Sequence, residues 1–105
     1  MAQFWVYKNT NRATQSRVPY LLDIQSPLLD ELQTTVVIPL YSKAFIGKAA
    51  ITKLCPEVEV DGEQFVAVTS QITGVDRKIL GEKTADLSDY RAEIIAAVDF
   101  IISGI

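Results

Sequence analysis

Side chains that could carry out catalysis are few in this sequence of 105 residues, because it contains no histidine and only one cysteine, Cys55. Histidine is the commonest general base and a frequent metal ligand, so its absence rules out every Ser/His or Cys/His catalytic pair. A lone cysteine can form neither an internal disulfide nor a zinc cluster. We interpret Cys55 as a small buried hydrophobic residue before Pro56, and we expect neither a metal nor a cofactor.

The remaining candidates for acid–base chemistry are carboxylates in predicted strands and turns, namely Asp23, Asp30, Glu31, Glu57, Glu59, Asp61 and Glu63. Glu57 and Glu59 alternate with valines, which is typical of the solvent-facing side of a strand. The sequence has no glycine-rich phosphate loop and no Cys-x-x-Cys pair. A ribonuclease without histidine is still chemically possible, with Arg, Glu, Tyr and Thr as its catalytic groups. The residues alone therefore identify no active site.

Composition predicts one folded domain over residues 1–105, since 49% of the residues are apolar and 22% are charged. The formal net charge of −3 argues against a direct nucleic-acid binder, which needs an excess of Lys and Arg. It is compatible with a basic protein partner. The chain opens with no signal peptide and has no apolar run long enough to span a membrane, so we expect a cytoplasmic protein.

The first two-thirds of the sequence predict β-strands, at Gln3–Tyr7, Pro19–Gln25, Thr34–Tyr41 and Asp76–Leu80, and a hairpin over Val58–Ser70. Asp61 and Gly62 suit the two-residue turn of that hairpin, and Gly81 is expected to stop the last strand. Pro39 cannot donate to a sheet ladder, so its strand should lie at an edge, bulge or bend there.

The segments between the predicted strands differ in character. The polar stretch Lys8–Arg17 predicts a solvated, mobile hairpin loop, with a basic loop that touches nucleic acid as the weaker alternative. Ser26–Gln33 predicts a long connection or one helical turn. Ser42–Pro56 has no clear period and predicts a loop.

The last segment changes to a helical period. Tyr90, Ile94, Val98 and Ile101 form one apolar stripe, which predicts a helix over Asp86–Ser103 with Gly104 as its C-terminal cap. Many strands followed by one helix predict a mainly β fold, a small barrel or sandwich-like sheet with a helix across it. The apolar ending FIISGI is unusual for a chain terminus, and must be covered by the chain's own core, by a second copy or by a partner.

Several stretches in order resemble one family. YLLDIQSPLLD resembles the F-V-D-V-Q-S-D-x-x-D signature of the CcdB toxins, and VVIPL matches their M-V-I-P-L. LCPEVEVDGEQF looks like their L-Y-P-x-x-x-I segment, and the DLS before the last helix and the closing GI also match. The similarity covers nearly the whole chain outside the Lys8–Arg17 loop.

The resemblance implies an SH3-like small barrel of the CcdB/MazF kind, with antiparallel sheets, one long terminal helix and a two-fold homodimer. It implies the toxin of a type II toxin–antitoxin module, which binds the A subunit of DNA gyrase and traps the gyrase–DNA cleavage complex without catalytic activity. A cognate, CcdA-like antitoxin would cover the toxin, and operon DNA would be bound only through the antitoxin complex. We expect no membrane partner.

The family's gyrase-binding positions, carried over to this sequence, are Leu28, Leu29, Asp99, Ile102, Ser103, Gly104 and Ile105. Ile94, Val98 and Ile101 would belong to the core or the dimer. The alternative is that FIISGI only closes the dimer core. Related toxins on the same barrel are ribonucleases, and a binding module without gyrase affinity is a third possibility.

This sequence departs from the family at Ser103, where the best-known member has tryptophan, and at Asp99, where it has a neutral amide. A stacked tryptophan often carries a binding hot spot of roughly 2 kcal/mol or more, and serine cannot stack. Either gyrase is held differently here, with Phe100 and electrostatics compensating, or this toxin is a weaker poison.

Overall fold

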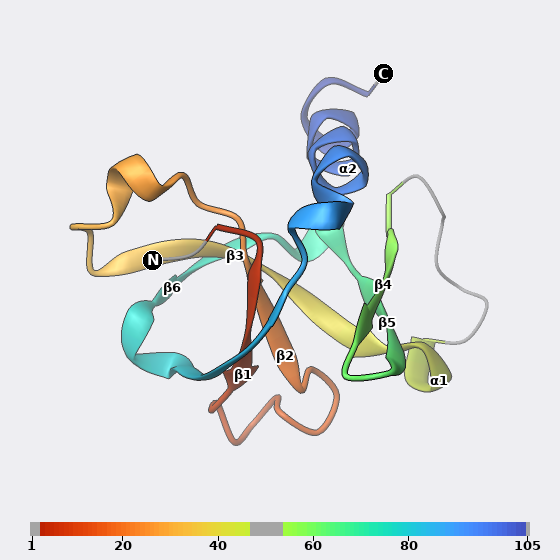
Figure 1. Cartoon of the computed structure of the whole chain (residues 1–105), viewed down its shortest axis with the longest axis horizontal. Coiled ribbons are helices and arrows are strands. Elements are labelled where there is room, and N and C mark those ends of the chain that lie inside the picture. Colours follow the sequence, from red (N-terminus) through yellow and green to blue (C-terminus); the bar gives the residue numbers. More distant parts are fainter. Residues whose placement is uncertain (1–2, 47–53, 105) are drawn as a thin grey trace.

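The described residues form a curled antiparallel sheet from which one longer helix projects (Figure 1). The computed structural model describes residues 3–46 and 54–104. Its strands are β1 (Trp5–Asn9), β2 (Tyr20–Asp23), β3 (Thr34–Ser42), β4 (Glu57–Val60), β5 (Glu63–Ala67), β6 (Thr73–Asp76) and β7 (Leu80–Asp86). The α-helices are α1 (Lys43–Ile46) and α2 (Arg91–Ser103), and short 3-10 turns are η1 (Pro27–Leu29), η3 (Thr69–Gln71), η4 (Arg77–Ile79) and η5 (Ser88–Tyr90).

The strands follow the order β4-β5-β3-β2-β1-β7, with β6 paired to β3. Every pair is antiparallel, so the sheet makes a half-barrel and the predicted mainly β fold with a C-terminal helix is confirmed. The long strand β3 is its centre, because it pairs with β2 on one side and with β6 and then β5 on the other.

The core lies inside the curl of the sheet and beneath the first turns of α2. Val6, Leu22, Ile38 and Leu40 from three strands and Ile94 from α2 are all fully buried in one cluster. Burying an aliphatic side chain of this size contributes roughly 1.5–3 kcal/mol, so these contacts hold α2 against the sheet. None of the helices in the described part of the chain is long and apolar enough to cross a membrane.

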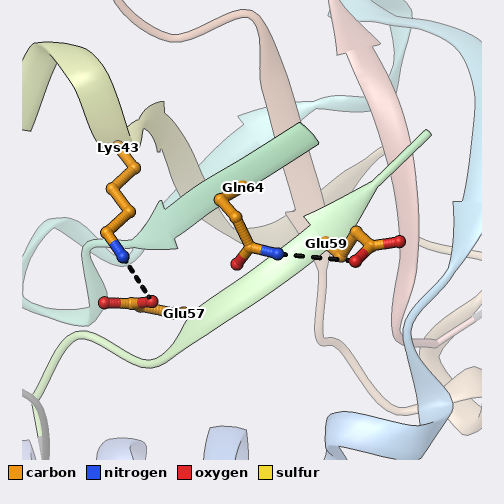
Figure 2. Close-up of polar contacts among 4 residues, drawn as sticks. All are labelled: Lys43, Glu57, Glu59 and Gln64. Carbon is orange, nitrogen blue, oxygen red and sulfur yellow. Dashed lines mark hydrogen bonds and ion pairs between the residues drawn. The ribbon is translucent and has the colours of Figure 1, made fainter. Parts of the chain in front are cut away.

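The β4–β5 hairpin matches its prediction. Asp61 and Gly62 take the positive φ values, 52° and 81°, that a tight two-residue turn requires. Glu57 and Glu59 face solvent, while the valines that alternate with them, Val58 and Val60, are buried. Figure 2 shows both carboxylates in local contacts, Glu57 with the Lys43 ammonium at 3.1 Å and Glu59 with the Gln64 amide at 3.4 Å. Cys55 is buried, as predicted.

Pro39 lies in a central strand instead of at an edge. It pairs with Leu21 of β2, and its carbonyl accepts a hydrogen bond of 3.1 Å from the backbone N–H of Val68 on the other side. β6 pairs with β3 up to Val37 and β5 from Leu40 onward. The missing N–H therefore falls where β3 changes partners, and no ladder bond is lost there.

The strand predicted over Asp76–Leu80 is wrong, because η4 separates β6 from β7 in this segment. Gly81 does not stop a strand but lies within β7. A Cβ at Gly81 would approach the backbone oxygen of Lys8 to 3.0 Å and the methyl group of Thr10 to 2.9 Å. Glycine is thus needed for the close approach of β7 to β1, which the sequence pattern does not reveal.

The terminal helix begins later than Asp86. Asp86 is the last residue of β7, and its carboxylate accepts a hydrogen bond of 2.8 Å from the backbone N–H of Ser88. That bond supports η5, and the α-helix follows from Arg91. The change of period in the sequence located the helix, but the first residues of the predicted range belong to the end of β7 and to the turn η5.

The Lys8–Arg17 loop is largely exposed, as predicted, but hydrogen bonds within the loop also anchor it. Its end is fixed by the buried side chain of Asn9, whose amide nitrogen donates to the Val18 carbonyl at 2.8 Å and to the Thr14 hydroxyl at 3.0 Å. The backbone N–H groups of Arg17 and Val18 both bond to the Thr14 carbonyl. The anchor is therefore polar, and a search for apolar anchors in the sequence missed it.

Candidate partner-binding surface

The C-terminal half of α2 leaves the core and exposes apolar side chains. Ile94 and Ala97 are fully buried, and Val98 packs against the core cluster. Farther along, Ile101 is 38% exposed and Ile102 is 78% exposed. In Figure 1 this end of α2 projects away from the sheet. The apolar stripe thus begins as core and ends as surface, and the dimer contact predicted for Ile101 stays a prediction.

The last helical turn is closed by its own backbone. Gly104 has a φ of 73°, and its N–H donates to the Phe100 carbonyl at 2.9 Å, which forms the predicted C-terminal cap. The Ser103 hydroxyl donates to the Asp99 carbonyl at 2.7 Å. Asp99, Ser103 and Gly104 are exposed, whereas Ile105 lies outside the described residues.

The other predicted binding residues, Leu28 and Leu29, belong to η1. Pro27 starts this turn, and the Ser26 hydroxyl caps it by accepting a hydrogen bond from the Leu28 N–H. Leu28 is 93% exposed and Leu29 is 47% exposed. A single turn with no buried residue cannot hide either side chain, so both are presented to solvent.

Arg77, which the sequence analysis did not single out, ties this loop to η4. Its Nε donates to the Leu32 carbonyl at 2.7 Å, and its Nη2 donates to the Leu29 carbonyl at 3.4 Å. Its backbone N–H donates to the Gln33 carbonyl at 2.9 Å. These partners lie more than forty residues away in the chain, so no local pattern could have indicated the contact.

Within one chain, the two predicted parts of the binding surface remain separate, because η1 and the C-terminal end of α2 lie apart in Figure 1. Other exposed apolar side chains that the sequence analysis did not name are Leu32, Phe45 and Ile95. Leu32 shares the loop of Leu28, and Ile95 shares the helix of Ile102. Each predicted segment therefore carries more apolar surface than its motif suggested.

The carboxylates considered for catalysis are spread over different elements. Asp23 is 2% exposed and accepts hydrogen bonds from the Thr35 hydroxyl at 2.8 Å and from the Gln25 N–H at 3.1 Å. It therefore joins β2 to β3. Among residues 3–46 and 54–104, no three His, Cys, Asp or Glu side chains group as metal ligands.

This architecture defines a class of small β-barrels with a C-terminal helix. A solved complex of an endoribonuclease with its cognate antitoxin, from mycobacterial species, has the same fold, with a TM-score of 0.75 and 11% sequence identity. The similarity covers 97% of this chain and 94% of that one. The family model described as "CcdB protein" matches residues 3–104 of this chain. The chain therefore belongs to the CcdB family, as its motifs indicated. It is thus of the toxin class of toxin–antitoxin modules.

Proposed function

We propose that this protein is the toxin of a type II module that acts in the cytoplasm, binds the A subunit of DNA gyrase and traps gyrase on cleaved DNA. It would do so as a non-catalytic poison, released by its cognate antitoxin. The observation that carries the proposal is the exposed apolar end of α2 in a chain of the CcdB family.

The energetic argument rests on side chains that gain from being covered. Ile102 and Leu28 are the two most exposed large apolar residues among those described, at 78% and 93%. Covering each of them fully would contribute roughly 1.5–3 kcal/mol to binding. A cluster of a few such residues is enough for a binding hot spot. In the last turn of α2 the Ser103 hydroxyl and the Gly104 N–H are already bonded within the helix, to the carbonyls of Asp99 and Phe100, so these two donors lose no partner when the surface is covered.

A homodimer would extend this surface. In a two-fold dimer the same face of α2 meets itself, and Ile101, which is 38% exposed, is available for that contact. We therefore expect a dimer in solution, with the two helix ends beside the two-fold axis. Sedimentation at micromolar concentration tests this expectation, and a well-folded monomer there would contradict it.

A ribonuclease is the second candidate function. It is favoured by the fold shared with an endoribonuclease. At 11% sequence identity, however, no catalytic residue of that protein can be assigned to a position in this chain. Glu57 and Glu59, which it could use as acid–base groups, make local side-chain contacts on the outer face of β4 (Figure 2). The non-catalytic poison remains our proposal.

Two assays on the purified protein separate the candidates, namely gyrase supercoiling with detection of cleaved DNA, and incubation with messenger RNA. We expect linear DNA from gyrase and intact RNA. RNA cleavage would favour the ribonuclease, and no effect in either assay would favour a binding module without gyrase affinity. Deletion of residues 103–105 should abolish the cleaved DNA while the melting temperature stays unchanged. A chain with alanines at 103–105 controls for length.

A further inference from the structure

The connection between β2 and β3 presents apolar side chains to solvent without packing them. We call residues 25–33 the leucine loop, because three of its exposed side chains are leucines, namely Leu28 at 93%, Leu29 at 47% and Leu32 at 49%. None of the residues 25–33 is buried. Apolar packing therefore does little to fix the direction of Leu28, and hydrogen bonds must hold the loop instead.

Hydrogen bonds within the loop give it its local shape. The N–H of Leu29 donates to the Ser26 carbonyl at 3.0 Å, and the N–H of Leu32 donates to the Leu29 carbonyl at 3.1 Å. The Gln25 side-chain amide spans the base of the loop, where it donates to the carbonyls of Leu29 and Thr34 at 3.4 and 3.3 Å. All these bonds join residues that are close in the sequence. They set the shape of the loop more than its direction relative to the sheet.

Arg77 reaches the leucine loop from a distant part of the chain. Its Nε and Nη2 donate to the carbonyls of Leu32 and Leu29 at 2.7 and 3.4 Å, and its backbone N–H donates to the Gln33 carbonyl at 2.9 Å. The sheet fixes the position of Arg77 itself, because the preceding residue, Asp76, ends β6, which is paired with β3. A guanidinium is planar and charged, so its two bonds fix both the distance and the direction of the loop relative to β6.

A third nitrogen of the same guanidinium is a cost for the fold. The Nη1 atom of Arg77 is buried, and within the described residues it has no hydrogen-bond partner. A buried donor without a partner destabilises the folded state, and this loss offsets part of what the other two bonds contribute. An apolar side chain of similar length would fill the same space without that loss. We therefore expect Arg77 to matter little for the stability of the whole fold and more for the direction of the loop.

We propose that Arg77 is a positioning residue of the gyrase-binding surface, which presents Leu28 by fixing the direction of the leucine loop. The proposal rests on the proposed function, because Leu28 belongs to the surface assigned there to gyrase. Leu28 lies within η1, which the Ser26 hydroxyl caps at its start and Arg77 holds at its end through the Leu29 carbonyl. A side chain that is already held in its bound direction loses less conformational freedom on binding.

A direct contact between Arg77 and the partner fits this geometry less well. Its Nε and Nη2 are bonded to the loop and its Nη1 is buried, so little of the guanidinium is left for an acceptor on another protein. The next residue, Lys78, is exposed and carries the same charge. Among the hydrogen bonds of the described residues, none joins the Lys78 side chain to the loop. A partner attracted by charge alone would respond to both residues, whereas the leucine loop depends on Arg77.

The first test uses the full-length protein and the purified gyrase A subunit, with affinity measured by surface plasmon resonance and stability by urea titration. Arg77→Met keeps the length of the side chain and removes its donors. We expect its affinity to fall about tenfold, while the midpoint of urea unfolding stays unchanged. Lys78→Met removes the same charge from the same turn, η4, and should change the affinity less than about twofold.

Three results of this test would overturn the proposal. They are an unchanged affinity in Arg77→Met, equal losses of affinity in Arg77→Met and Lys78→Met, and a clear fall of the urea midpoint in Arg77→Met. The last result would show that Arg77 supports the fold as a whole instead of the direction of one loop.

A double-mutant cycle tests whether Arg77 acts through Leu28. Leu28→Ala alone should weaken binding of the gyrase A subunit. Adding Arg77→Met to Leu28→Ala should then weaken binding by no more than about twofold, because the main side chain that Arg77 positions is already gone. The full loss seen for Arg77→Met alone, repeated in the Leu28→Ala background, would show that Arg77 acts through other groups and would overturn the proposal.

The order of the loop in the free protein separates this proposal from the proposed function. In NMR relaxation of the isotope-labelled chain, the amides of Leu28 and Leu32 should have lower order parameters in Arg77→Met than in the unsubstituted protein, whether or not gyrase binds. The amide of Val36 in β3 should not change. Equal order parameters for the loop in the two proteins would overturn the positioning role. An unsubstituted protein that does not bind the gyrase A subunit would instead contradict the proposed function.

Discussion

The two ends of the molecule present opposite kinds of surface. The end of α2 projects from the sheet (Figure 1) and is rich in apolar side chains, its Ser103 hydroxyl and Gly104 N–H are bonded within its own last turn, and Ile102 lies 78% exposed. A hollow of about 280 Å³ lies under the β1–β2 loop, with Leu21, Pro39 and Val75 among its apolar lining residues. Arg17 also lines this hollow, and within the described residues its guanidinium has neither an ion pair nor a hydrogen bond. An exposed apolar end gains mainly from exclusion of water, whereas a hollow with an unpaired guanidinium discriminates by charge.

The largest effect is expected where α2 joins the core. Ile94 is completely buried, and Ile94→Ala should lower the free energy of unfolding by about 2–5 kcal/mol. Ile102→Ala is the matched control, because a surface change of this kind costs within about 0.5 kcal/mol. Urea titration measures both. Similar losses for the two variants would show that the end of α2 is structural, and the contrast between its two halves would disappear.

The next effect concerns the stem of the loop. Asn9→Ala removes the donor to the buried Val18 carbonyl and the acceptor of the part-buried Asn11 N–H. Each such group costs about 1–3 kcal/mol, so stability should fall by that order and the hollow should lose its shape. Asn11→Ala, in the exposed part of the same loop, is the control. Hydrogen exchange at Val18 reports the result, and unchanged protection in Asn9→Ala would contradict the role assigned to Asn9.

The sequence predicted the elements whose signal is local. The β4–β5 hairpin follows from Asp61-Gly62 between alternating strands, and α2 follows from its period. The α2 surface was visible because its apolar residues are contiguous in FIISGI. The hollow could not be predicted from the sequence, because its lining comes from residues 9–21, 39–41 and 71–79, which meet only in the folded sheet.

The errors in the predicted fold have the same origin. Pro39 is accommodated in a central strand because β3 changes partners beside it, which depends on where β5 and β6 end. Gly81 is required by contact with β1 rather than by a turn. Arg77 holds the Leu28 loop by hydrogen bonds to backbone carbonyls. Such contacts cannot be predicted from the spacing of side-chain types in the sequence. These three features are therefore determined by long-range backbone contacts, which local sequence patterns cannot predict.

A smaller effect is expected at Ser103. Its hydroxyl bonds only to the Asp99 carbonyl of its own helix, and the residue is exposed, so Ser103→Trp should leave stability unchanged within about 0.5 kcal/mol. An added ring beside Ile102 should strengthen gyrase binding by about 1–2 kcal/mol, roughly tenfold. Surface plasmon resonance with the gyrase A subunit measures it, and Ser103→Ala is the control. If both variants bind alike, this protein holds its target through other residues, with Asp99 and Phe100 the next to change.

The smallest effect is expected at the ion pair beside the loop. The Lys8 ammonium lies 3.1 Å from the Glu82 carboxylate, and this hydrogen bond and charge raise the pKa of Lys8 above its usual value of 10.5. Since the folded-state pKa is the higher one, the pair stabilises the fold below the usual lysine pKa. That contribution is lost as pH rises through the folded-state pKa.

Glu82→Gln should therefore lower the pKa of Lys8, measured by NMR titration of its side chain, and Glu63→Gln at the exposed β4–β5 turn should not. Both side chains of the pair are largely exposed, so the melting temperature at neutral pH should not change measurably. The loop and its hollow would then depend on the buried Asn9 amide and not on surface charge. A clear fall in the melting temperature of Glu82→Gln would reverse that conclusion, because it would place the Lys8–Glu82 pair among the contacts that hold the loop.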